Sequence, residues 1–466
     1  RKGKVPVLNI VGDHATSHVK YDAQLQSDIE TVARNVSPGF VRTSQSTADL
    51  SRDALAALAA ARGLPGQVAT LILPADVSWS EGGAPCPPAP PAQPASADDA
   101  TIAQIAALMR TGDQVALLLG GHALREAGLM AAARIATHTG AQLFAECFPT
   151  RMERGAGLPG VERIAYLAEL AGVQLAPFRH LVLVDAKSPV SFFAYPGKKS
   201  DLVPEGCAVH TLASPAQDAA ASLQALARAL GADGATPALR TARRPVRPTG
   251  RLTAPKACKA IGHLLPERAI VIDEAITSGL MLGVMTAGSP RHDLLTLTGG
   301  AIGQGLPNAV GAAIACPDRP VLALVGDGSA MYTLQALWTM AREQLDVTAI
   351  IFNNASYSVL NVELERVGAR GEVGSKARAQ LDLGGPALDF ARLAQGMGVH
   401  AARADSAEAF CTALEYALAQ PGPHLIEALV PESLAGAKRR VLPWMLRALP
   451  SLPPQVAQAI KRKIAP

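Results

Sequence analysis

The chain has 466 residues, of which 49% are apolar, 18% charged and 4% aromatic. This apolar content excludes a disordered chain, and no apolar run approaches the roughly 18 residues of a membrane span. The net charge of +4 comes from residues 433–466, which hold seven Lys and Arg and no acid. The remaining 36 basic and 39 acidic residues exclude a basic body that binds nucleic acid. Six scattered cysteines without a CxxC pair exclude a zinc ribbon and indicate a reducing cytoplasm.

Two segments have the composition of linkers. One is rich in proline, which favours extended backbone, and the other is rich in arginine and proline. They divide the chain into a first domain, a linker, a central domain, a second linker, a third domain and a basic tail: residues 1–83, 84–100, 101–232, 233–253, 254–432 and 433–466.

Each domain shows strands alternating with helices. The first has apolar runs at residues 5–11 and 68–74 around an alanine-rich helix at 53–62. The central domain has a helix that ends in glycine, at residues 124–140, between strands at 114–121, 141–146 and 180–186. The third has strands at 268–274, 294–300, 321–328 and 347–354. Apolar strands alternating with helices predict the α/β class, with parallel sheets covered on both faces.

The third domain carries the strongest motif. A strand ends in Gly326-Asp327-Gly328-Ser329, and the next strand ends near Asn354, 27 positions after Asp327. A strand–helix–strand unit takes about 30 residues, so both side chains can reach the same sheet edge. A carboxylate and an amide oxygen there suit Mg²⁺, with a phosphate beside them. The alternative is that both segments are ordinary turns at strand ends.

This pair of motifs, GDG followed by NN after a fixed gap, resembles the binding motif of thiamine-diphosphate (ThDP) enzymes. The segment GDGSAMYTLQALW resembles benzoylformate decarboxylase and its acetolactate-synthase-like relatives. The resemblance implies a three-domain α/β architecture with ThDP and Mg²⁺ as cofactors. By resemblance, Asp327 and Asn354 bind Mg²⁺ together with the backbone carbonyl of Ser356.

Further site residues follow from the same resemblance. Gly328, Ser329 and Tyr357 would lie beside the diphosphate. Thr277 and Ser278, in DEAITSG, would contact the diphosphate or else cap a helix.

The glycine-rich segment TGGAIGQGLPNAVGAAIA lies upstream of the metal motif. It resembles the segment that lies against the aminopyrimidine ring of the cofactor. The resemblance implies that Ile302 holds ThDP in its bent conformation and that the Gly300 carbonyl accepts from the 4′-amino group. Plain core packing is the alternative for Ile302.

The first domain resembles only the second half of the pyrimidine-binding domain of the family. We therefore expect that domain to be incomplete, without the segment that carries the catalytic glutamate, and this chain alone to be inactive. His14, at a strand end in GDHAT, is a tentative catalytic residue, with a simple turn role as the alternative.

The central domain lacks GxGxxG and the arginine pattern of flavin-binding relatives, so bound FAD is not expected. The basic tail has three interpretations: a flap over the cofactor, attachment to an acidic membrane surface, or a solvated basic end. The resemblance implies a homodimer or homotetramer, because the site forms between two chains.

The expected activity is decarboxylation or carboligation of a small 2-oxo acid, as in acetolactate synthase. The segment after Asn354 lacks the synthase pattern, which favours decarboxylation of the benzoylformate type. An interpretation from another class is a non-catalytic protein that keeps the fold without its glutamate. A third is a dinucleotide-binding oxidoreductase.

Overall fold

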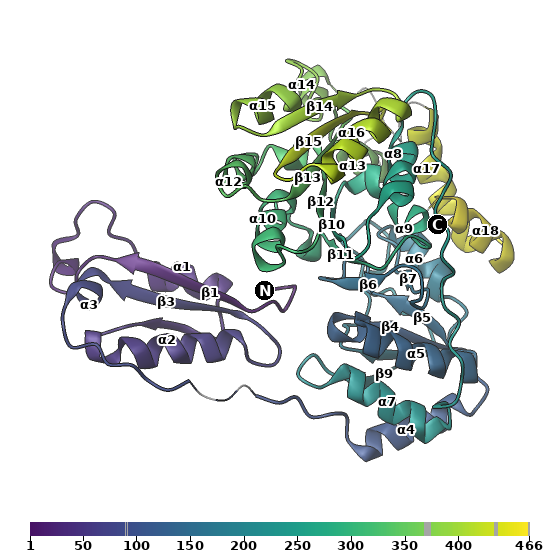
Figure 1. Cartoon of the computed structure of the whole chain (residues 1–466). Coiled ribbons are helices and arrows are strands. Elements are labelled where there is room, and N and C mark those ends of the chain that lie inside the picture. Colours follow the sequence, from purple (N-terminus) through teal and green to yellow (C-terminus); the bar gives the residue numbers. More distant parts are fainter. Residues whose placement is uncertain (89, 91, 368–373, 433–436, 465–466) are drawn as a thin grey trace. The chain divides into compact units, whose positions relative to one another are not determined.

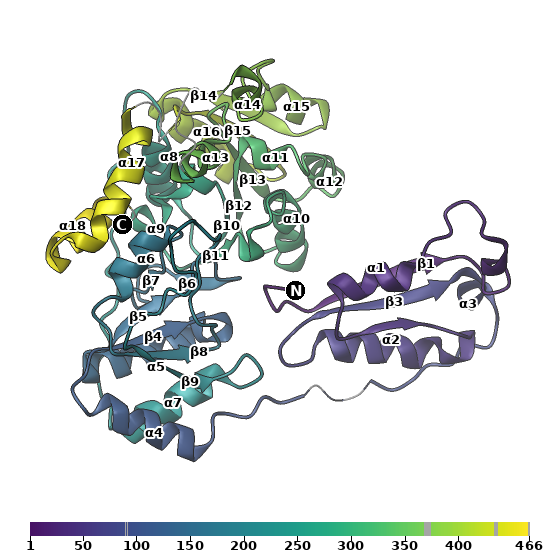
Figure 2. The same cartoon turned by 180° about the vertical axis from the view of Figure 1, so that it is seen from behind.

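The structure is a computed structural model that describes residues 1–88, 90, 92–367, 374–432 and 437–464. It contains two compact units, shown in Figures 1 and 2. One unit comprises residues 1–98 and 213–222, and the other comprises residues 99–212 and 223–466.

The first unit is built on a three-stranded parallel sheet in the order β1-β3-β2. Helices α1 and α2 lie on either side of it (Figures 1 and 2). Helix α2 begins earlier than predicted, because the side chain of Ser46 accepts a hydrogen bond from the backbone N–H of Asp49 and caps the helix there. The elements are β1 Val7–Asp13, α1 Ile29–Val36, β2 Val41–Thr43, α2 Thr47–Ala61, β3 Val68–Pro74 and α3 Ala75–Trp79.

A second sheet has five strands in the order β7-β5-β4-β8-β9. Its middle strand β4 is completely buried, as expected for a parallel sheet with helices on both faces. Helix α5 ends where predicted, since Gly140 adopts the left-handed conformation. The elements are α4 Asp99–Met109, β4 Val115–Leu119, α5 Glu126–Thr139, β5 Gln142–Ala145, β7 Glu162–Arg163, α6 Ala168–Leu175, β8 His180–Val184, β9 Ala208–Ala213 and α7 Ala219–Leu230.

The largest sheet has seven strands in the order β14-β15-β13-β12-β10-β11-β6. Neighbouring strands pair in parallel except β6, which pairs antiparallel with β11 although its sequence position lies in the predicted central domain. Buried side chains form one apolar cluster on each face of this sheet. The strands are β6 Met152–Arg154, β10 Ile270–Glu274, β11 His292–Thr296, β12 Val321–Gly326, β13 Val347–Asn353, β14 His400–Ala404 and β15 His424–Leu429.

The helices around this sheet confirm the predicted strand–helix alternation and the α/β class. They are α8 Ala254–Leu264, α9 Leu282–Met285, α10 Gly305–Ala315, α11 Asp327–Ala330, α12 Ala336–Arg342, α13 Ser358–Arg366, α14 Ser375–Ala379, α15 Phe390–Gly396 and α16 Ala407–Ala419. No helix in the described part of the chain is long and apolar enough to cross a membrane.

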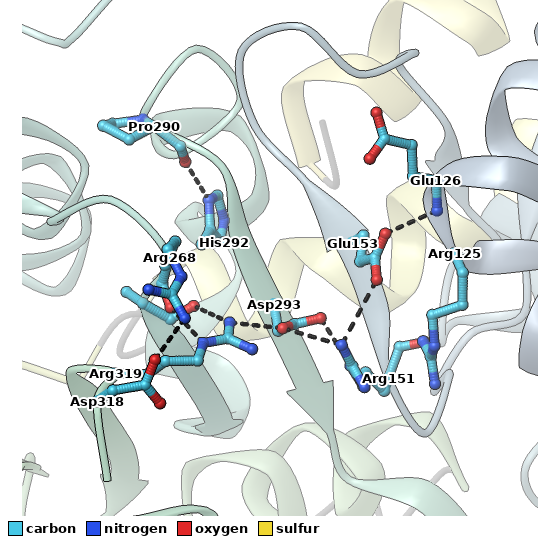
Figure 3. A network of polar contacts seen from close by, with 11 residues as sticks. Arg125, Glu126, Arg151, Glu153, Arg268, Pro290, His292, Asp293, Asp318 and Arg319 are labelled. Carbon is cyan, nitrogen blue, oxygen red and sulfur yellow. Dashed lines mark hydrogen bonds and ion pairs between the residues drawn. The ribbon is translucent and has the colours of Figure 1, made fainter. Parts of the chain in front are cut away.

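A polar network joins the residue before β6 to β11 and to the segment before β12, and all three strands belong to the seven-stranded sheet (Figure 3). Asp293 in β11 is 4% exposed and accepts hydrogen bonds from Arg151 at 2.7 Å and from Arg319 at 2.6 Å. Burial alone would raise the pKa of Asp293, but the bonds from the two arginines outweigh burial and hold that pKa below its ordinary value.

This network makes stability depend on pH. A carboxyl whose pKa is lowered by folding stabilises the fold above its unfolded pKa, and this stabilisation is lost as the pH falls through the folded pKa. We expect Asp293→Asn to lower the free energy of unfolding by about 2–3 kcal/mol at pH 7. In urea unfolding series, the difference in unfolding free energy between Asp293→Asn and the unmodified chain should narrow below about pH 4. A difference that stays constant with pH would contradict this role.

The predicted linker at residues 233–253 is a fixed part of the larger unit. It contains no helix or strand, but backbone hydrogen bonds join Arg240 to Leu158 and Arg243 to Gly288. Leu252 is completely buried. The segment therefore packs against the larger unit, which its composition did not indicate.

The basic tail contains two helices, α17 Ala437–Ala448 and α18 Pro454–Ile464, drawn in yellow in Figure 1. Leu442, Leu446 and Leu449 are buried in one cluster with side chains of α6 and α13. Lys461 forms an ion pair with Glu162. The solvated-end interpretation is therefore wrong, because these three leucines pack against the domain, although Val441 and Trp444 between the basic residues are exposed. The first four tail residues, 433–436, lie outside the described residues.

Candidate cofactor site

The GDG and NN segments meet at one edge of the seven-stranded sheet. Strands β12 and β13 pair in parallel, with Gly326 opposite Phe352, so Asp327 and Asn354 emerge side by side. One carboxylate oxygen of Asp327 accepts a hydrogen bond from the N–H of Gly328 at 2.8 Å. The other accepts from the N–H groups of Asn354 at 2.9 Å and Ala355 at 2.7 Å. The structure therefore brings the two sequence motifs into direct contact.

The carboxylate of Asp327 is buried without a cationic partner. Asp327 is 4% exposed, and no Lys or Arg pairs with it within the described ranges. Burial raises the pKa of Asp327, and the backbone hydrogen bonds only partly oppose this. A bound cation would supply the missing counter-charge, so the site fits a metal ion.

The other predicted metal ligands lie on the loop after β13. The Asn354 side-chain oxygen accepts from the N–H of Ser356 at 3.0 Å, and the Ser356 carbonyl accepts from the N–H of Ser358 at 2.8 Å. Each of these oxygens has a second lone pair for a metal. Carboxylate, amide and carbonyl oxygens are the ligands that Mg²⁺ prefers. Throughout the described residues, no group of three or more His, Cys, Asp or Glu side chains could hold a metal instead.

The residues predicted to lie beside the diphosphate surround the same loop. The ring of Tyr357 lies against Gly328, where a Cβ would come within 2.3 Å of the ring atom Cε1. Ser329 is 5% exposed and follows directly in α11. Only glycine at position 328 lets the Tyr357 ring pack this closely.

Thr277 and Ser278 lie in the 3₁₀ helix η3 Ile276–Gly279, which follows β10. Because β10 pairs with β12, η3 begins at the same sheet edge as Asp327. The N-cap residue of η3 is Ala275, which makes no side-chain cap hydrogen bond, so neither hydroxyl residue is the N-cap of this helix. Their role at the diphosphate stays a prediction.

The glycine-rich segment approaches the same edge from β11. Gly300 ends the 3₁₀ helix η4 Thr298–Gly300 with φ of 72°, and the ring of Phe192 packs directly on it. Ile302 follows, half-buried, and belongs to neither apolar cluster of the sheet. Its side chain is therefore not part of the packed core, which favours the interpretation of Ile302 as a cofactor contact.

The sequence pattern did not single out Glu274 or Phe192. Glu274, the last residue of β10, is 1% exposed and accepts hydrogen bonds from backbone N–H groups of the turn before α10. An acidic residue at the end of an apolar strand is the signal that could have found it. The contact of Phe192 with Gly300 depends on long-range packing, which has no local signal.

His14 lies in the first unit, directly after β1. Its backbone N–H donates to Asp13 at 2.7 Å, and its ring is 5.4 Å from that of His18. These contacts are compatible with the turn role, and the catalytic role stays a prediction.

In α/β sheets, ligands bind beyond the carboxyl ends of the strands, and this edge of the mostly parallel seven-stranded sheet holds a carboxylate, an amide and a glycine-rich turn. The family model that matches residues 278–428 is "Thiamine pyrophosphate enzyme, C-terminal TPP binding domain". A putative acetolactate synthase large subunit IlvX of Mycobacterium tuberculosis is 55% identical over 441 residues, which are 94% of this chain and 83% of that protein. The chain therefore belongs to the thiamine-diphosphate-dependent enzymes that include acetolactate synthase large subunits.

Decarboxylases of the same cofactor class are also similar. Benzoylformate decarboxylase of Pseudomonas aeruginosa is 41% identical over 131 residues, which are 28% of this chain and 23% of that protein. The solved structure of a Rhodococcus jostii ThDP-dependent 4-hydroxybenzoylformate decarboxylase matches with a TM-score of 0.78 at 22% identity, covering 93% of this chain and 84% of that one. This structural match concerns the fold. The family assignment contradicts the interpretation as a dinucleotide-binding oxidoreductase.

Proposed function

We propose that the protein uses ThDP and Mg²⁺ to decarboxylate or ligate a small 2-oxo acid. The observation that carries this proposal is the buried Asp327 carboxylate, which contacts the loop of Asn354 and Ser356 and has no cationic partner among the residues that the structure describes. Asp327, Asn354 and the Ser356 carbonyl would hold the metal. Gly328, Ser329 and Tyr357 would lie along the diphosphate, with Thr277 and Ser278 on its other side.

The remaining residues would act at the opposite end of the cofactor. ThDP, when bound, would supply a nucleophilic carbon and a ring that serves as electron sink for decarboxylation of a 2-oxo acid. The Gly300 carbonyl would accept a hydrogen bond from the 4′-amino group, and Ile302 would support the bent conformation from its half-buried position. The packing of Phe192 on Gly300 would keep water away from that side of the ring.

The choice between decarboxylation and ligation is tested by the product. With ThDP and Mg²⁺ present, pyruvate, 2-oxobutyrate and benzoylformate would each be incubated with the protein. For a chain that also carries the segment with the catalytic glutamate, we expect aldehyde as the main product, because the segment after Asn354 lacks the synthase pattern. Acetohydroxy acid as the main product would instead support ligation. Binding of ThDP without turnover of any 2-oxo acid would support the non-catalytic interpretation.

The central domain supports the proposal that FAD is not a cofactor. In the turn after β4, the N–H of His122 donates to the Asp185 carboxylate at 2.8 Å. A Cβ at Gly121 would lie 2.0 Å from that same carboxylate. The backbone donor that could receive a dinucleotide phosphate is thus taken by a negatively charged group, which would repel a phosphate.

We also propose a homodimer or homotetramer in the cytoplasm. Ile10 in β1 and Val32 in α1 are 63% and 70% exposed, and contact with another subunit would cover such apolar side chains. All six cysteines are free, which suits a reducing compartment. Sedimentation equilibrium measures the assembly directly, and a monomer at micromolar concentration would overturn this part of the proposal.

A further inference from the structure

Glu274 lies between the two parts of the candidate cofactor site. It is the last residue of β10 and pairs in register with Val325, two residues before Asp327. Its side chain is 1% exposed, and no Lys or Arg pairs with it in the part of the chain that the structure describes. A buried carboxylate needs strong hydrogen-bond donors, so its partners show what it holds in place.

The hydrogen-bond donors to Glu274 in the described part of the chain belong to one backbone turn. One oxygen accepts from the N–H of Gly303 at 2.5 Å and of Gln304 at 3.3 Å, and the other accepts from the N–H of Gly305 at 2.6 Å. This turn connects Ile302 to the start of α10. A single side chain from the metal edge of the sheet thus fixes the backbone that immediately follows Ile302.

The turn leaves little room for another arrangement. Gly303 has φ of 89°, and a Cβ on it would lie 2.6 Å from that of Tyr332. The Thr333 hydroxyl donates to the Gly303 carbonyl at 2.7 Å. The turn is therefore held on one side by Glu274 and on the other by the segment that follows α11.

We infer that Glu274 is a positioning residue that fixes Ile302 and Gly300 relative to the Asp327 edge, and so sets the spacing between the ring-binding and diphosphate-binding parts of the site. The inference rests on the proposed function. If Glu274 sets this spacing, its loss weakens binding of the whole cofactor more than binding of the diphosphate part. A carboxylate that only caps α10 would affect both ligands alike.

The experiment compares two ligands on the full chain. Isothermal titration with Mg²⁺ present gives dissociation constants for ThDP and for inorganic pyrophosphate, which lacks the rings. Glu274→Gln keeps the shape but turns one acceptor oxygen into an N–H₂ group, so at least one turn N–H loses its partner. We expect ThDP affinity to fall about ten- to a hundredfold and pyrophosphate affinity to change less than about twofold.

Asp293→Asn is the matched control, because Asp293 is a buried carboxylate at the opposite end of the neighbouring strand β11. It should cost stability without changing the ratio of the two affinities. Thr333→Val removes the second restraint and should change the ratio in the same direction as Glu274→Gln, which keeps the test open if the Glu274 variant does not fold. Equal losses of affinity for both ligands, or unchanged ThDP affinity, would overturn this inference but not the proposed function. Absence of ThDP binding by the unmodified chain would overturn the proposed function itself.

Discussion

Replacing Asp327 with alanine is expected to abolish Mg²⁺-dependent binding of ThDP, with a loss of affinity of more than about a hundredfold. The carboxylate is the single charged ligand among the proposed donors, and it also accepts the N–H groups of Asn354 and Ala355 that shape the loop. Its removal therefore takes away both the charge and the loop geometry. Titration of ThDP into the protein at fixed Mg²⁺ measures the effect.

The matched control for this variant is Asp318→Ala. Asp318 is exposed and forms an ion pair with Arg268 at 2.6 Å, away from the site. The Asp318→Ala substitution changes the net charge by the same amount as Asp327→Ala, so a general electrostatic effect on an anionic ligand would appear in both variants. We expect Asp318→Ala to bind ThDP with the same affinity as the unmodified chain. Equal losses in the two variants, or unchanged affinity in Asp327→Ala, would refute the metal assignment.

The second large effect is expected from Arg366→Leu. Arg366 ends α13, the helix that begins just after the proposed metal loop, and its side chain is 4% exposed. It donates to Glu169 of α6 at 2.9 Å, to Glu363 at 3.0 Å and to the Tyr195 hydroxyl at 2.9 Å. Among the described residues, removing the cation leaves Glu363 with only the hydroxyl donors of Tyr166 and Tyr195, and leaves Glu169 with only Lys198, at 3.8 Å. We expect this loss to cost about 3–5 kcal/mol in unfolding free energy.

Arg392→Leu provides the comparison for the arginine variant. Arg392 is 87% exposed and pairs with Asp389 at 3.4 Å. An exposed pair contributes little, so we expect a change below about 0.5 kcal/mol. Urea unfolding of both variants, followed by tyrosine and tryptophan fluorescence, decides between these values. Similar costs for the two substitutions would show that the buried network does not hold α13 against α6.

The contact between the GDG and NN motifs could be predicted from sequence because the information for it is local. Asp327 and Asn354 lie on one strand–helix–strand unit, and their spacing alone brings them to the same sheet edge. The parallel strands β10, β12 and β13 were equally predictable, since each is a continuous apolar run that ends in polar residues.

The features that the sequence did not predict depend on contacts between distant segments. The pairing of β6 with β11, the packing of the tail on α6, and the contact of Phe192 with Gly300 each join residues more than a hundred positions apart. Glu274 is an intermediate case. Its place at a strand end was visible, but the three backbone groups that it holds became apparent only when the following turn was placed beside it.

The most direct test of the central proposal is a crystal structure of the protein grown with ThDP and Mn²⁺ in place of Mg²⁺, with anomalous data that locate the metal. We expect one anomalous peak coordinated by Asp327, Asn354 and the Ser356 carbonyl, with the diphosphate beside Gly328. A peak elsewhere, or ThDP bound without metal at this loop, would contradict the account.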